Sequence, residues 1–329
     1  MSRKKKTVEE IKNEVKEAYA ELETGLQELM TSEKYLNFLN TMAERPKYSL
    51  NNTLLIYLQK PEATFLAGYG KFQEKYGHQV QQGEKGIKIF APIIHKKKDN
   101  VLLEDDEESK KKEESTIVGY RMVRIFDISQ TKPIMEKTEE GNEIPCKKAQ
   151  RLIDSLSYLK LIDLWAGDEE FQEELVAATK DAIDIPVLEE ELSPELGGYF
   201  RFNDKDKLDI VINSNFGITS RFTTLLHEWT HYRLHNPYNK NGGETEGIPE
   251  KIEKQDKEIQ AESVAYIVAK HFGINSSSDS LKYVASWSKG KDLKDLKKSM
   301  EIIQRTAATF IEAIEIRLEK EGFAIRSHA

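Results

Sequence analysis

Two histidines and a glutamate have the spacing of a metal site. Residues 227–231 read HEWTH, the pattern H-E-x-x-H. Side chains four residues apart lie on one face of a helix, so His227 and His231 can bind the same zinc ion. Glu228 then stands where a general base could reach a water bound to that ion. Apolar residues around the motif recur at helical spacing, which predicts a helix with one buried face.

A catalytic zinc also needs a third protein ligand and an open position for water. Cys146 is the single cysteine and lies far from the histidines in sequence, so we expect a carboxylate. In the stretch QAESVAY, Glu262 lies on a largely apolar helical face, where a carboxylate is costly unless an ion compensates it. Glu258, one turn earlier on the same face, is the alternative. His235 lies four residues after His231 on the same helical face, and it is expected to be a supporting residue or a surface histidine rather than a metal ligand.

The elements around this motif read as short strands and longer helices. Strands are predicted over 184–188, 199–202 and 208–213, and helices over 147–160, 168–182, 252–272, 279–288 and 293–321. The strand at 208–213 lies directly before the histidine helix. Many zinc peptidases use that order to hold an extended substrate by strand addition.

The first half of the chain mixes helical and strand patterns. Helices are predicted over 7–31, 36–42, 51–59 and 68–76, and strands around Val80 and over 87–94 and 117–128. The charged segment 96–114 is expected to be a solvated hairpin loop. The predicted fold class is therefore α+β. An N-terminal α+β domain over 1–145 would precede a mainly helical domain over 146–329.

Composition limits the function classes. The 329 residues are 38% hydrophobic and 32% charged, which is typical of a globular protein, and no apolar run is long enough for a membrane span. The single cysteine excludes an internal disulfide, and we expect a cytoplasmic location. The net charge of −8 divides into +1 over residues 1–150 and −9 over the remainder. Any surface that binds nucleic acid must therefore be local.

Two regions together resemble a known family. The back half has HEWTH, then a glycine-rich loop and AESVAYIVA, and it resembles the gluzincin-like domain of ArdC-type antirestriction proteins. It is similar, more loosely, to the ImmA/IrrE metallopeptidases. The front half resembles the ArdC N-terminal domain in YSLNNTLLI (48–56), QKP (59–61), AGY (67–69), QGEKGIKI (82–89), AP (91–92) and FDISQT (126–131).

The resemblance implies a single-stranded-DNA-binding N-terminal domain joined to a zincin-like metallopeptidase domain. It implies one zinc ion held by His227, His231 and Glu262, with Glu228 as the catalytic base. Such proteins are carried by plasmids, phages and conjugative elements and protect incoming DNA from restriction. The implied partners are single-stranded DNA and a protein or peptide substrate, such as a component of a restriction system.

Aromatic and basic residues alternate in the front half, as expected of a single-strand binder, which stacks bases on rings beside cationic groups. A few core aromatics beside a solvated lysine face would give the same pattern. The candidate DNA-contact residues are Lys47, Asn51, Asn52, Tyr69, Lys71, Phe72, Lys85 and Lys88.

An alternative hypothesis is that the protein is not an enzyme. In it the zinc is structural, and the protein shields DNA or binds the restriction enzyme. The intact Glu228 favours the catalytic reading, because a purely structural site has no need of a base. Replacing Glu228 by glutamine separates the two readings.

Overall fold

The computed structural model describes residues 7–29, 32–96, 115–204, 207–238, 252–275 and 291–321. Over these residues helices and small sheets are combined, which confirms the predicted α+β fold class. The charged segment 97–114 and the predicted helix 279–288 lie outside the described residues.

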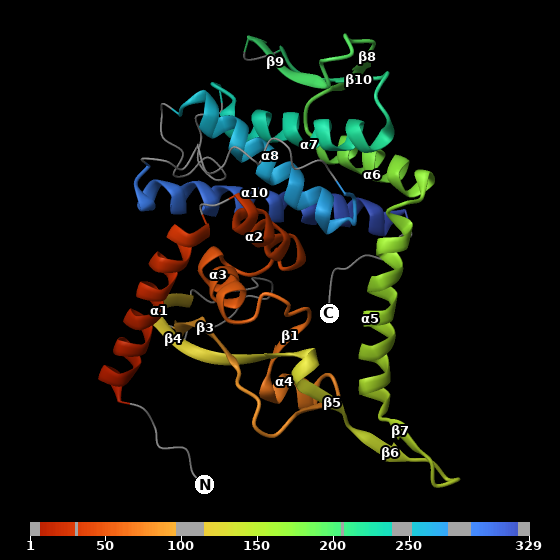
Figure 1. Ribbon diagram of the computed structural model, residues 1–329. Helices are drawn as coiled ribbons and strands as arrows, with labels where there is room; N and C mark the ends of the chain where they lie inside the picture. The colour runs from red at the N-terminus through yellow and green to blue at the C-terminus, as the bar shows by residue number, and fades with distance from the viewer. Residues whose placement is uncertain are drawn as a thin grey trace, which may run out of the picture.

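The front of the chain packs four helices around a small antiparallel sheet (Figure 1). The helices are α1 (Val8–Leu29), α2 (Ser32–Glu44), α3 (Leu50–Gln59) and α4 (Tyr69–Glu74). The sheet has the order β1-β4-β3, with β1 (Leu66–Gly68), β4 (Ser115–Asp127) and β3 (Ile87–Lys96). Two smaller pairs follow, β2 (His78–Val80) with β5 (Thr131–Pro133) and β6 (Met135–Lys137) with β7 (Glu143–Pro145).

The outer edge of β3 is closed by amide side chains of α3. Asn52 donates to the carbonyl of Phe90 at 3.0 Å and accepts from its N–H at 2.8 Å. Gln59 makes the same pair of bonds with Lys88, both at 2.9 Å. The two amides are two helical turns apart and so lie near one face of α3. They satisfy backbone groups that an unpaired edge strand would otherwise expose.

The back of the chain is mainly helical and carries a second three-stranded sheet. Its helices are α5 (Lys147–Trp165), α6 (Glu169–Ala182), α7 (Ile218–His235), α8 (Lys254–His271) and α10 (Leu293–Lys320). The sheet has the order β8-β10-β9, with β8 (Val187–Glu190), β10 (Lys207–Asn213) and β9 (Gly198–Asp204).

This sheet order corrects one expectation. The strand directly before the histidine helix, β10, is paired on both sides, parallel to β8 and antiparallel to β9. It therefore has no free edge for an added strand. The edge strand that meets the histidine helix is β9, because the N–H of Phe200 bonds to Glu228.

Helices from both halves of the sequence share one buried core. Helix α2 lies along α8 and makes hydrogen bonds to it at both ends and in the middle. These contacts are Tyr35 Oη to Ser263 Oγ, Tyr266 Oη to Asn40 Oδ1, and His271 Nδ1 to the carbonyl of Ala43, each 2.8 Å. The division at residue 145 stays a prediction from the sequence.

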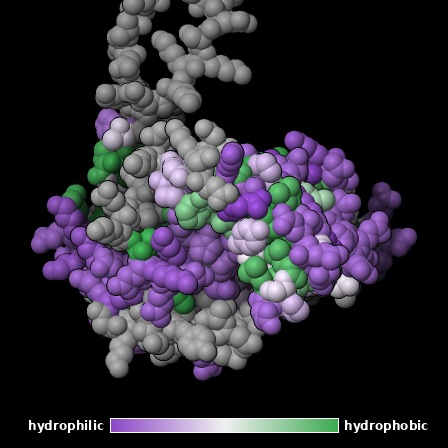
Figure 2. Space-filling model, turned by 90° about the horizontal axis from the view of Figure 1, so that it is seen from above, coloured by the Kyte–Doolittle hydropathy of each residue, from purple (hydrophilic) through white to green (hydrophobic). Residues whose placement is uncertain are grey.

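The face of the molecule seen in Figure 2 is largely polar. Figure 2 views the molecule from the end that carries β8, β9 and β10, and hydrophobic groups there form small separate patches among hydrophilic ones. None of the helices in the described part of the chain is long and apolar enough to cross a membrane.

Candidate metal centre

Packing of α7 aims the two histidines away from the core. Phe222, Leu225 and Trp229 are buried on one side of this helix. The Trp229 ring stacks on Phe310 of α10 with centroids 3.6 Å apart and planes 4° apart. At 100° per residue, His227 and His231 fall on the other side of the helix, which faces α8.

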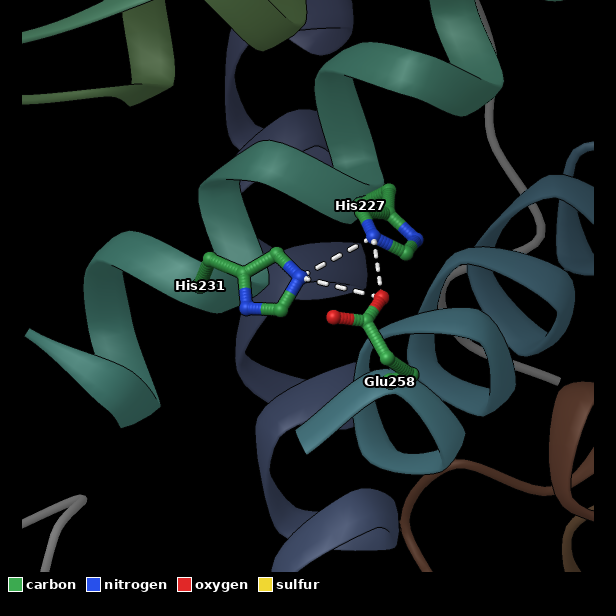
Figure 3. A group of neighbouring side chains, drawn as sticks. All are labelled: His227, His231 and Glu258. Carbon is green, nitrogen blue, oxygen red and sulfur yellow. Dashed lines mark hydrogen bonds and ion pairs between the residues drawn. The ribbon is translucent and has the colours of Figure 1, made fainter. Parts of the chain in front are cut away.

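Three ligand atoms converge between α7 and α8 (Figure 3). The Nε2 atoms of His227 and His231 lie 3.0 Å apart, and Glu258 Oε2 lies 3.5 Å from the first and 3.7 Å from the second. These separations leave a point about 2 Å from all three atoms, which matches the ~2.0–2.2 Å of zinc–nitrogen and zinc–oxygen bonds. The donor set therefore fits one divalent ion.

The carboxylate facing both Nε2 atoms belongs to Glu258, the alternative ligand from the sequence. Glu262, the first choice, has its Oε1 3.3 Å from Nδ1 of His227, the ring nitrogen on the far side. A carboxylate in that position orients a ligating imidazole and raises its basicity. The side chain of Glu258 is 46% exposed, so the centre is open to solvent on the α8 side.

Burial, hydrogen bonds and nearby charges shift the pKa values of the residues at this centre. Burial alone would lower the pKa of His227, but hydrogen bonds to Glu258 and Glu262 and the charge of Glu228 outweigh it and raise that pKa to about 10. Hydrogen bonds to His227 and His231 hold the pKa of Glu258 far below its usual range. A metal ion would have to displace the imidazolium proton, so binding releases protons.

Glu228 lies on the strand side of the centre. Its Oε2 accepts a hydrogen bond from the N–H of Phe200 in β9 at 2.8 Å. Burial raises the pKa of Glu228, and the charges of His227 and His231 oppose that rise. A carboxyl with a raised pKa suits proton transfer near neutral pH.

His235 lies next to His231 on the side away from the converging ligand atoms. Its Nδ1 lies 2.8 Å from Nδ1 of His231, and its Nε2 lies 3.0 Å from Oε1 of Gln260. Burial lowers the pKa of His235 to about 3. Among the described residues, the group of converging ligand atoms is made by His227, His231 and Glu258 and does not include His235.

Two of the predicted DNA contacts are corrected by the front-half structure. The Phe72 ring is fully buried, in a cluster with Phe65 and Tyr76, so it cannot stack on a base while the fold is intact. The Asn52 amide is already bonded to Phe90. Tyr69, in contrast, is 50% exposed, and its hydroxyl accepts from Gln79 Nε2 at 2.7 Å.

The predicted lysines remain available. Lys47, Lys71, Lys85 and Lys88 are exposed, and Asn51 is half-buried. Sequence reasoning missed two cations that the strand registers identify. Arg124 lies opposite Lys88 on β4, and Lys132 lies opposite Gln79 on β5. Only knowledge of the strand pairing could have found them.

A surface hollow surrounds Tyr69. It lies where α4, β2 and β5 meet, and it combines one aromatic ring, side-chain amides and one cation. Its lining residues are Tyr69, Gln79, Val80, Gln81, Gln82 and Lys132.

Comparison with known proteins finds a family match at the front of the chain. Residues 5–126 match the family described as the N-terminal domain of anti-restriction factor ArdC. The chain is 29% identical, over 96% of its length, to the uncharacterised protein pXO2-81 of Bacillus anthracis. It spans 54% of the length of that relative.

Two solved structures are similar over most of the chain. One is the metal-free antirestriction protein ArdC from plasmid R388, at 18% identity and a TM-score of 0.47, covering 83% of this chain and 86% of that one. The other is the Mn(II)-bound structure of the same protein, at 17% identity and a TM-score of 0.43, covering 82% and 84%.

Proposed function

We propose that this chain is an ArdC-type antirestriction protein with two working parts, because residues 5–126 match the N-terminal domain of anti-restriction factor ArdC. One is a zinc-dependent peptidase centre between α7 and α8. The other is a single-stranded-DNA-binding surface in the front half. The observation that carries the first part is the convergence of His227 Nε2, His231 Nε2 and Glu258 Oε2 beside Glu228.

His227, His231 and Glu258 are the proposed metal ligands, and Glu262 orients His227 from behind. Two imidazoles and one carboxylate suit zinc and leave a position open, as catalytic zinc sites require. An ion held there would supply a Lewis acid that polarises a carbonyl and acidifies water. Glu228 would accept the proton of the attacking water and pass it to the leaving amine.

The edge of β9 is the proposed place for an extended peptide. The outer edge of this strand meets Glu228 through the N–H of Phe200. An antiparallel peptide paired with that edge would run past the base, and backbone hydrogen bonds would hold it whatever its side chains. This proposal moves the predicted strand addition from β10 to β9.

The test of the chemistry is Glu228→Gln. Glutamine keeps the shape of the side chain but cannot take a proton, so we expect the variant to bind zinc like the wild type and to lose peptide hydrolysis. Zinc content by elemental analysis and cleavage of a peptide library measure the two properties. Cleavage by the variant at the wild-type rate would exclude Glu228 as the base.

The competing candidate is a non-catalytic antirestriction protein with a structural metal. The same variant separates the two functions when cells that carry a restriction system receive unmodified DNA. Loss of protection in Glu228→Gln, with zinc retained, ties protection to catalysis. Full protection by this variant would favour shielding of DNA or binding of the restriction enzyme.

We propose further that single-stranded DNA binds over the hollow around Tyr69, with Lys71, Lys85 and Lys88 as flanking cations. An exposed ring can stack on any base, and nearby lysines neutralise phosphates. Arg124 adds a second cation beside Lys88 across the strand pair. Phe72 and Asn52 are not among the proposed DNA contacts, because Phe72 is buried in the core and the Asn52 amide is hydrogen-bonded to Phe90.

Fluorescence anisotropy of the full chain with labelled single- and double-stranded oligonucleotides tests this surface. Tyr69→Ala should weaken single-strand binding by about 1–3 kcal/mol if the ring stacks on a base. Lys85→Ala with Lys88→Ala should weaken binding mainly through the salt-dependent part. Tyr238→Ala, an exposed tyrosine of the back half, is the matched control. Equal affinity for duplex and single strands would contradict the proposal.

A further inference from the structure

Three aromatic rings form a row beside the proposed base. The Phe200 ring of β9 has its centroid 5.6 Å from that of Tyr232 on α7 and 5.5 Å from that of Phe202. Phe200 and Tyr232 pack against the main core, whereas Phe202 is 49% exposed. A single exposed phenylalanine is common on protein surfaces. This one ends a row of rings that starts at the residue after His231.

The row follows from the way β9 lies along α7 (Figure 1). A Cβ at Gly198 would lie 2.8 Å from Thr224 Cγ2, so strand and helix are in close contact there. Two residues later in the strand and four later in the helix, the N–H of Phe200 bonds to Glu228. These steps are about 6.4–6.8 Å in a strand and about 6 Å in a helix. Because the steps nearly match, the next one brings Phe202 to the helical turn after Glu228.

The backbone of β9 is open on the side of Glu228. In an antiparallel pair, alternate residues direct their N–H and C=O groups to the partner strand, and the residues between direct theirs away. The carbonyl of Gly197 accepts from the N–H of Asn213 in β10, whereas the N–H of Phe200 points to Glu228. Phe202 lies two residues after Phe200, so its N–H and C=O face the same outer edge. Among the described strands, β9 pairs with β10 alone.

We propose that Phe202 is a specificity-determining residue that selects a large apolar side chain in a peptide substrate. The inference rests on the proposed peptidase function and names the class of peptide that it takes. In a peptide paired antiparallel with β9, the side chain opposite Phe202 lies on the same face of the sheet, against that ring. The peptide passes Phe202 before it reaches Glu228, so the selected side chain lies on the amino side of the cleaved bond.

The other face of β9 makes the opposite demand. Arg201 points to that face and forms a pair of hydrogen bonds with Asp209, both at 2.9 Å. Side chains of a paired peptide alternate between the two faces. The residues on either side of the selected one would therefore lie over a polar face, where a polar side chain keeps its hydration. The expected substrate has one large apolar residue between two polar or small ones.

Binding of peptides to the metal-free full chain tests this subsite without catalysis. The probes are fluorescein-labelled decapeptides of alanine and serine with phenylalanine, leucine or aspartate at one central position. By anisotropy, the phenylalanine and leucine peptides should bind about 10- to 100-fold more tightly than the aspartate peptide, because an apolar side chain leaves water. Phe202→Ala should abolish the preference, and Phe202→Leu should keep most of it. Leu188→Ala, at an exposed position on the other edge strand, is the control and should keep it in full.

A second readout is the set of bonds that the zinc-loaded wild-type chain cleaves in a peptide library. Large apolar residues should be enriched within two positions before the cleaved bond. Equal binding of the phenylalanine and aspartate peptides, no binding of any probe, or an unchanged preference in Phe202→Ala would overturn the subsite. Selective binding without cleavage would support the subsite and reject the peptidase chemistry. Cleavage without the enrichment would support the chemistry and reject the subsite.

Discussion

At the scale of single residues, the proposed ligand set depends on which of two glutamates of α8 faces the histidine pair. Glu258 Oε2 faces both Nε2 atoms, whereas Glu262 meets the far nitrogen of His227. On the proposed assignment, loss of Glu258 removes a metal ligand, whereas loss of Glu262 removes only a residue that orients one. We expect Glu262→Ala to weaken zinc binding by about 10- to 100-fold and Glu258→Ala to weaken it further.

Zinc constants by chelator competition, with elemental analysis after dialysis, compare the two variants. Glu253→Ala, an exposed carboxylate at the start of α8, is the control and should bind zinc like the wild type. A larger loss in Glu262→Ala than in Glu258→Ala would restore Glu262 as the third ligand.

The sequence predicts the histidine pair and the base, because spacing within one helix determines which side chains share a face. It cannot order Glu258 and Glu262, since both satisfy the same helical spacing. Their order depends on how far α8 is shifted along α7, and tertiary packing sets that shift. Tyr69 and Phe72 pose the same problem, because both are aromatic and one turn apart, yet one is exposed and the other buried.

At the scale of elements, the sequence predicts most helices of the described chain, including α1, α3, α6, α8 and α10, to within a few residues. Helix periodicity is a local property and can be read without the partner element. Strand order is not local. The sequence therefore suggested β10 as the substrate strand, while pairing with β8 and β9 leaves the edge to β9.

The amide pairs at β3 give a prediction about this edge. Asn52→Leu removes the side chain that satisfies both backbone groups of Phe90, leaving a half-buried donor and acceptor without their partners. We expect a loss of about 1–3 kcal/mol in the free energy of unfolding and faster aggregation, because an open edge can pair with another chain. Urea unfolding and light scattering measure the two effects.

Asn51→Leu is the matched control for that change, since its side chain is also half-buried and adjacent on α3. It leaves the bonds to Phe90 intact and should aggregate like the wild type. Equal stability of Asn52→Leu and wild type would mean that water replaces the amide at this edge at no cost.

At the scale of the whole molecule, a buried histidine–glutamate contact ties the front helix α2 to α8 and α10 of the back half. His271 of α8 lies 3.0 Å from Glu315 of α10 through Nε2, and its Nδ1 reaches the carbonyl of Ala43 at the end of α2. A carbonyl only accepts, so Nδ1 must donate. The imidazole therefore links three helices, and the carboxylate is its buried partner.

Removal of the Glu315 carboxylate should lower the stability of the front and back halves of the chain together. Glu315→Ala leaves Nε2 of His271 buried without its hydrogen-bond partner, and such an unsatisfied buried group costs about 1–3 kcal/mol. Because α2 and α8 share one core, the loss should appear in amide hydrogen exchange of both helices and in the urea midpoint of the whole chain. Glu312→Gln, exposed on the same helix, should change neither. Faster exchange confined to α8 and α10 would show that the front helices are stable without this link, as the predicted boundary at residue 145 requires.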